Sequence, residues 1–107
     1  MMVVFHRVEE FKAELQAEVS AKSVDHNLVR VCVSRRVAGP EMDFMVVASY
    51  TCWMEVVQLR CTIGTCLYGM SEDQINLAKK ADEIVKDLEA WAKNRGLDVR
   101  HGAHYEH

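Results

Sequence analysis

Proline and long apolar stretches are scarce in this sequence. Pro40 is the only proline among the 107 residues. No stretch approaches the roughly 18–20 uninterrupted apolar residues that a membrane-spanning helix needs, and the apolar run at residues 1–5 ends at His6 and Arg7. That run is also too short for the core of a signal peptide and has no positive region before it. We therefore expect a soluble, cytoplasmic protein with no membrane contact.

The sequence also lacks a paired-cysteine motif and an excess of positive charge. Cys61 and Cys66 are separated by four residues rather than by the two of a redox or zinc motif. Three of the four cysteines lie in strand-like segments, where free cysteine packs as a small hydrophobic side chain; the four are Cys32, Cys52, Cys61 and Cys66. We expect all four thiols to be reduced. The net charge of -3 and the pI near 5.9 disfavour nucleic-acid binding, which depends on clustered lysine and arginine.

The residues that are present suit an ordinary globular protein. The composition is 50% hydrophobic and 27% charged, as in most folded domains. A chain of this length buries roughly 65% of its unfolded surface, which suffices for a core without metal or disulfide cross-links. We therefore expect residues 1–107 to form a single compact domain.

The first third of the chain changes from helical to strand periodicity. Between residues 4 and 19 the apolar residues follow one another in steps of three or four, which predicts an amphipathic helix; they are Val4, Val8, Phe11, Leu15 and Val19. From residue 29 to residue 34 the period is two, with valine at every second position. That alternation predicts a half-buried strand.

Two more strands are predicted after the turn signal at Gly39 and Pro40. Residues 44–53 and 56–63 both alternate, although the joint between them, residues 51–55, contains no glycine, proline or asparagine. We infer a turn there because one strand over residues 44–63 would be about 20 residues long, well beyond the usual three to ten.

A long helix follows the strands. Residues 64–69 indicate a loop, and Ser71 with Gln74 three residues later matches a capping box. Helical spacing then continues to Arg95, with Gly96 as the C-cap; the apolar positions are Ile75, Ala78, Ala81, Ile84 or Val85, Leu88, Trp91 and Ala92. Residues 97–100 alternate as a short strand, and residues 101–107 are expected to be loose. The prediction is an α+β fold with an N-terminal helix, a three-stranded antiparallel meander, a long C-terminal helix and a short fourth strand at the sheet edge.

The predicted order of helix, three strands and helix resembles the double-stranded-RNA-binding domain. Residues 39–41 before Phe44 and residues 78–81 in the last helix echo the patterns of that family. The family reads RNA through its first helix, a histidine after Gly-Pro, and lysines at the start of its second helix. Here those places hold Glu14 and Glu18, then Met42, then residues 71–74. The resemblance therefore implies a shared topology and no RNA binding.

No group of residues forms a recognisable catalytic or metal site. His101, His104 and His107 are three residues apart, but no carboxylate or thiol is placed to complete a metal site. The loop at residues 64–69 lacks the lysine of a phosphate-binding loop. Cys66 in that loop has no base placed beside it, and the acidic residues that follow disfavour a thiolate. We therefore predict no metal and no cofactor.

The sheet face turned away from the helices is the most informative feature. Alternation places few charges on it, whereas a face meant for water carries more; the positions singled out as a binding surface are Met45, Val47, Trp53, Val56 and Arg60. Tryptophan, methionine and arginine are enriched at protein interfaces. Either a second copy of the chain covers this face, or the C-terminal segment or the first helix folds across it.

Two classes of function stay open. The first is a non-catalytic binding or interaction module, a homodimer with a groove or sheet face for a protein or a small apolar ligand. The second is a small enzyme with its active site at a subunit interface, around Tyr50, Trp53, Arg60 and Tyr68. A pocket with a histidine or carboxylate of shifted pKa would favour the enzyme, and a flat apolar patch would favour the module.

Overall fold

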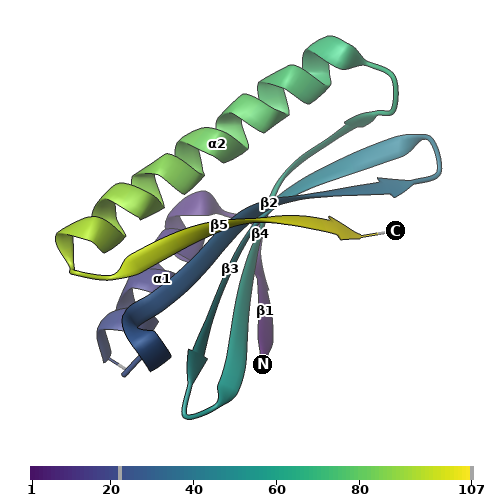
Figure 1. Cartoon of the computed structure of the whole chain (residues 1–107). Coiled ribbons are helices and arrows are strands. Elements are labelled where there is room, and N and C mark those ends of the chain that lie inside the picture. Colours follow the sequence, from purple (N-terminus) through teal and green to yellow (C-terminus); the bar gives the residue numbers. More distant parts are fainter. Residues whose placement is uncertain (22, 107) are drawn as a thin grey trace.

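Two helices lie on one face of a five-stranded sheet in the computed structural model (Figure 1). The structure describes residues 1–21 and 23–106, and the side chains of residues 1–21 and 23–100. No helix in these ranges is long and apolar enough to cross a membrane. The elements are β1 (Met2–Phe5), α1 (Val8–Ala21), the short 3₁₀ helix η1 (Asp25–Asn27), β2 (Leu28–Ala38), β3 (Glu41–Cys52), β4 (Glu55–Leu67), α2 (Ser71–Asn94) and β5 (Asp98–Glu106).

The sheet is mixed, with the strand order β1-β4-β3-β2-β5. Its three central strands form the predicted antiparallel meander, whereas β1 pairs parallel with β4 and β5 pairs parallel with β2. The prediction of three strands and one short edge strand was therefore incomplete. The strand at residues 97–100 is present and continues to Glu106, into the segment that we expected to be loose.

The missing strand, β1, had been assigned to the first helix. Val4 stands four residues before Val8, a spacing that fits a helix, but Val4 pairs with Arg60 of β4 and the helix begins only at Val8. The stretch Met2–Phe5 contains two β-branched valines, which favour a strand, and His6 and Arg7 separate it from the helix.

Both helices cover the same face because of how they connect the strands. The helix α1 links β1 to β2, and α2 links β4 to β5; both connections run in the same direction across the sheet between strands that point the same way. Two such connections of one hand must pass over one face. Buried residues of both helices belong to one core with the inner strand residues; from α1 they are Phe11, Leu15 and Val19, and from α2 Ala81, Ile84, Val85 and Leu88.

Most of the buried positions predicted for the long helix are confirmed. Leu88 is 2% exposed, and Trp91 is half-buried against the core with the guanidinium of Arg95 5.9 Å from its ring centre. Ile75, in contrast, is 53% exposed because the first turns of α2 extend past the core. The predicted capping box does not form, since the helix begins at Ser71 after Met70 and has no side-chain cap.

The loop predicted at residues 64–69 is largely strand. The strand β4 continues to Leu67 through an irregularity in its pairing with β3 next to Phe44. Gly64 permits this path, because a Cβ atom built there would lie 2.7 Å from Cδ2 of Leu77 on α2. Cys66 is consequently a buried strand residue, which leaves no exposed loop thiol for catalysis.

Candidate binding surface

The outer face of the sheet is open in this chain. Both helices pack on the inner face, and β5 extends the sheet at its edge beside β2 (Figure 1). The alternative that the first helix or the C-terminal segment folds across the outer face is therefore wrong for the described residues. Four of the five predicted binding residues lie on this open face, namely Met45, Val47, Val56 and Arg60.

Val47 lies at the centre of the open face. Its cross-strand neighbours are Cys32 on β2 and Arg60 on β4. Although no helix covers Val47, the side chains around it leave it only 3% exposed. Burial raises the pKa of the Cys32 thiol, and the charge of Arg60 partly counteracts that rise. Cys32 is therefore a thiol, packed beside a cation at the middle of the sheet.

An apolar margin runs along the β1 side of the open face. Val56 is 60% exposed, Met2 59% and Val4 44%. The register places Met2 beside Gln58 and Val4 beside Arg60, so Met2 is a diagonal neighbour of Val56 and Val4 lies further along the same sheet edge. Exposed apolar side chains are common singly, but neighbouring ones on an uncovered face form a candidate contact surface.

Trp53 lies in a turn and not at a strand position, contrary to the alternation predicted for residues 44–53. The turn inferred between residues 51 and 55 is confirmed as a two-residue hairpin loop, Trp53 and Met54, with φ of 54° and 65°. Both side chains are almost fully exposed. Positive φ at both positions is the requirement of a type I′ turn, which usually contains asparagine and glycine. The sequence therefore gives no conventional turn signal here.

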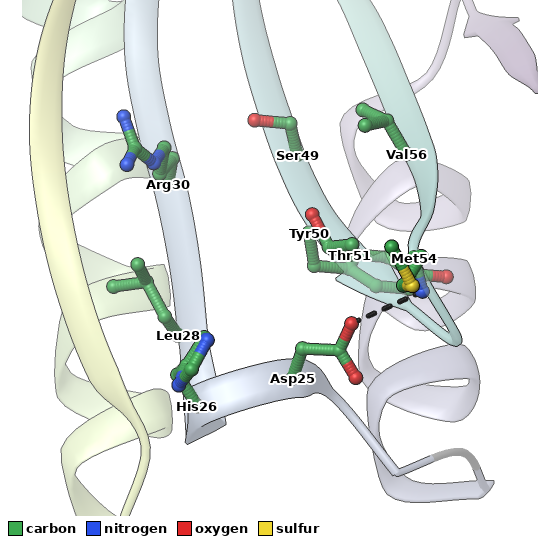
Figure 2. Close-up of a pocket in the computed structure, with 9 residues that line it drawn as sticks. All are labelled: Asp25, His26, Leu28, Arg30, Ser49, Tyr50, Thr51, Met54 and Val56. Carbon is green, nitrogen blue, oxygen red and sulfur yellow. Dashed lines mark hydrogen bonds between the residues drawn. The ribbon is translucent and has the colours of Figure 1, made fainter.

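A hollow of about 530 Å³ opens at this end of the face, between the β3–β4 turn and η1 (Figure 2). The backbone N–H of Met54 donates to Oδ2 of Asp25 at 3.2 Å, which joins the two loops. The lining comes from both loops and from three strands; it consists of Asp25, His26, Leu28, Arg30, Ser49, Tyr50, Thr51, Met54 and Val56. Of these residues, sequence analysis had singled out Val56 for the binding surface and Tyr50 for the alternative enzyme site.

The left-handed backbone residues gather around this hollow. Apart from glycine, the described residues with positive φ are His26, Asn27, Trp53 and Met54, which belong to η1 and to the β3–β4 turn. Residues other than glycine and asparagine rarely adopt this conformation, and such strain is found preferentially at functional sites. The two strained loops, which are joined by a hydrogen bond, therefore make this end of the sheet a candidate functional site.

The four residues named for an enzyme site do not come together in one chain. The hydroxyl of Tyr50 donates to Oε2 of Glu18 on α1 at 3.1 Å, which is on the helical side of the sheet, whereas Arg60 is on the open face. Burial first, and then the hydrogen bond and charge of Glu18, raise the pKa of Tyr50 above its usual range. Tyr68 lies at the other end of the sheet, where its N–H donates to the carbonyl of Pro40.

The described residues contain no cluster of three or more histidine, cysteine, aspartate or glutamate side chains that could hold a metal ion. The side chains of His101, His104 and His107 lie outside the described part of the chain. All four cysteines are free of disulfide bonds, and three of them are buried. The cysteines therefore act as packing residues in this fold.

No family model, no curated protein and no solved structure matches the chain. Its function must therefore be inferred from the chemistry and geometry of its own residues.

Proposed function

We propose that the protein is a non-catalytic interaction module that associates with a second copy of itself through the open sheet face. The observation that supports this proposal is the uncovered face centred on Val47, with Met45 beside it and the apolar margin of Met2, Val4 and Val56. Burial of apolar area drives association, and a stable dimer buries at least about 1,000 Å² in total.

Sedimentation of three lysine variants tests this proposal. Val47→Lys places a charge at the centre of the proposed interface, and Val4→Lys places one at its margin. In the monomer a lysine can extend its ammonium group into water, but in the dimer the charge would be desolvated at a cost of several kcal/mol. Ile75→Lys is the matched control, because Ile75 is 53% exposed on α2, away from the face.

We expect the wild type and Ile75→Lys to sediment as dimers at high micromolar concentration, and both other variants to sediment as monomers with unchanged far-ultraviolet circular dichroism. Val4→Lys keeps the test decisive if Val47→Lys fails to fold, since Val4 is 44% exposed already. A monomeric wild type would refute the proposal, and so would a dimer that both Val47→Lys and Val4→Lys leave intact.

A further inference from the structure

The hollow beside η1 has the size and construction of a small-molecule pocket. Its volume of about 530 Å³ falls within the roughly 300–1,000 Å³ of ligand pockets. All of its lining residues belong to one chain. An inference about this pocket therefore goes beyond self-association and does not depend on it.

The strand residues that line the pocket belong to two successive rows with different chemistry, and Gln58 continues the first row just outside the lining. Arg30, Ser49 and Gln58 are neighbours in one row. The next row toward the turn pairs Thr51 with Val56, and Leu28 lies two residues before Arg30 on β2, so it faces the same side. Successive rows on one face of a sheet lie about 7 Å apart. A ligand across both rows would therefore contact a cationic, polar row at one end and a mainly apolar row at the other.

Two guanidinium groups bracket the polar row. Arg30 is exposed and has no ion pair with any described side chain. On the other side of Ser49, Nε of Arg60 donates to Oε1 of Gln58 at 2.8 Å, which holds this second guanidinium beside the row. Planar guanidinium groups bind carboxylate, phosphate and sulfonate oxygens through paired hydrogen bonds.

The remaining polar groups fit the same kind of ligand. The hydroxyls of Ser49 and Thr51 line the pocket and have no hydrogen-bond partner among the described residues, so they can donate to ligand oxygens. The one acidic lining residue, Asp25, lies beyond the apolar row, at the far end from Arg30 (Figure 2), and its Oδ2 accepts the N–H of Met54.

The distribution of charge over the whole chain also favours an anion on this side. The two helices carry ten acidic and five basic residues, whereas the rest of the chain carries six acidic and eight basic residues. The helices lie on the opposite side of the sheet from the pocket. The excess of acidic residues therefore lies on the helical side of the sheet, away from the pocket, although the whole chain has a net charge of -3.

We propose that this pocket binds a small organic anion with an apolar body. The anionic group contacts Arg30 and Ser49, and the apolar body lies over Leu28 and Val56, under the exposed side chain of Met54. The two strained loops close the end of the pocket and fix its length. The ligand is of the class of hydrophobic carboxylates, sulfonates or phosphate monoesters, and it binds without a covalent step.

Two fluorescent probes of nearly the same shape test the charge requirement. The probe 8-anilinonaphthalene-1-sulfonate carries the anionic group, and N-phenyl-1-naphthylamine lacks it. We expect Arg30→Gln to weaken binding of the sulfonate at least about tenfold, as expected for the loss of a charged hydrogen bond, and to change binding of the uncharged probe little. Arg36→Gln is the matched control, because Arg36 is an exposed residue on the same face of β2, outside the pocket.

Three results would overturn the proposal: no binding of the sulfonate, equal affinity in Arg30→Gln and wild type, or an equal loss in Arg36→Gln. Amide chemical-shift changes should concentrate at Ser49, Thr51 and Val56, and changes confined to other parts of the chain would count against this pocket. Repeating the titration on Val4→Lys separates the two proposals, because that variant removes the proposed dimer contact but leaves every lining residue in place.

Discussion

The turn between β3 and β4 contains backbone strain that substitution can remove. Trp53 and Met54 adopt φ of 54° and 65°, a conformation that costs L-residues roughly 1–2 kcal/mol each. Their side chains are 87% and 92% exposed, so little packing is lost when they are replaced. The double substitution Trp53→Asn/Met54→Gly introduces the residues that a type I′ turn prefers.

We expect this double variant to be more stable than the wild type. Relief of backbone strain at the two positions would stabilise the fold by roughly 2–4 kcal/mol. Asparagine keeps part of the strain, and glycine lowers the stability by roughly 0.5–1 kcal/mol because it makes the unfolded chain more flexible. The net gain in the free energy of unfolding should be about 1–2 kcal/mol. At about 4–8 °C per kcal/mol for a domain near 100 residues, the melting temperature should rise clearly.

Urea denaturation followed by circular dichroism measures this gain without relying on tryptophan fluorescence. The matched control is Trp53→Ala/Met54→Ala, which removes the same side chains but keeps residues that avoid positive φ. Both variants should be compared in the Val4→Lys background, so that any change in self-association does not contribute. If the Asn-Gly variant is no more stable than the Ala-Ala variant, the turn is not strained and the reasoning fails.

Three further measurements test the packing of the fold. Leu88→Ala should lower the free energy of unfolding by about 2–5 kcal/mol, because Leu88 is 2% exposed, while Lys86→Ala on the exposed face should change it little; equal denaturation midpoints would show that the helix face is wrong. In Tyr50→Phe the free energy of unfolding should fall less steeply above pH 10 than in the wild type. The pKa of Tyr50 is raised in the folded state, so this residue contributes stability that is present below the unfolded pKa of about 10 and is lost as the pH rises. Parallel wild-type and variant curves between pH 8 and pH 11 would contradict that role. Thiol titration under non-reducing conditions should find four reactive groups in unfolded protein. In native protein Cys32 should react fastest, since the other three are buried; fewer than four groups in fresh unreduced material would contradict the free thiols.

Periodicity predicted the elements whose side chains have a clear inside and outside. The alternation of Val29 and Val31 and the helical spacing around Leu88 both reflect burial against one core, and the structure confirms them. The strand β1 was missed because Val4 occupies a position that also suits the helical spacing that begins at Val8. Four residues are too few for a period of two to outweigh a period of 3.6.

The pocket was beyond prediction because it depends on tertiary contacts between two loops. Asp25 and Met54 are far apart in the sequence, and their hydrogen bond exists only once β2, β3 and β4 are paired in register. The turn residues Trp53 and Met54 are among the least typical for their conformation. Arg30 alternates with the inward-facing Val29 and Val31, but nothing in the sequence indicated which residues would lie beside it.

The open face itself follows from the topology. Each helix connects two parallel strands across the sheet in the same direction, and a common hand places both helices on one side. The described part of the chain has no third long element for the other side, since β5 extends the sheet beside β2. A sheet face left open by its topology is expected to be polar, yet Val47 sits at its centre and Val56 is 60% exposed at its margin. Val47 is shielded by its neighbours, so the apolar area that binding would remove from water is that of the margin. Because Val56 belongs both to this margin and to the pocket lining, a partner copy and an amphipathic anion would compete for this end of the face.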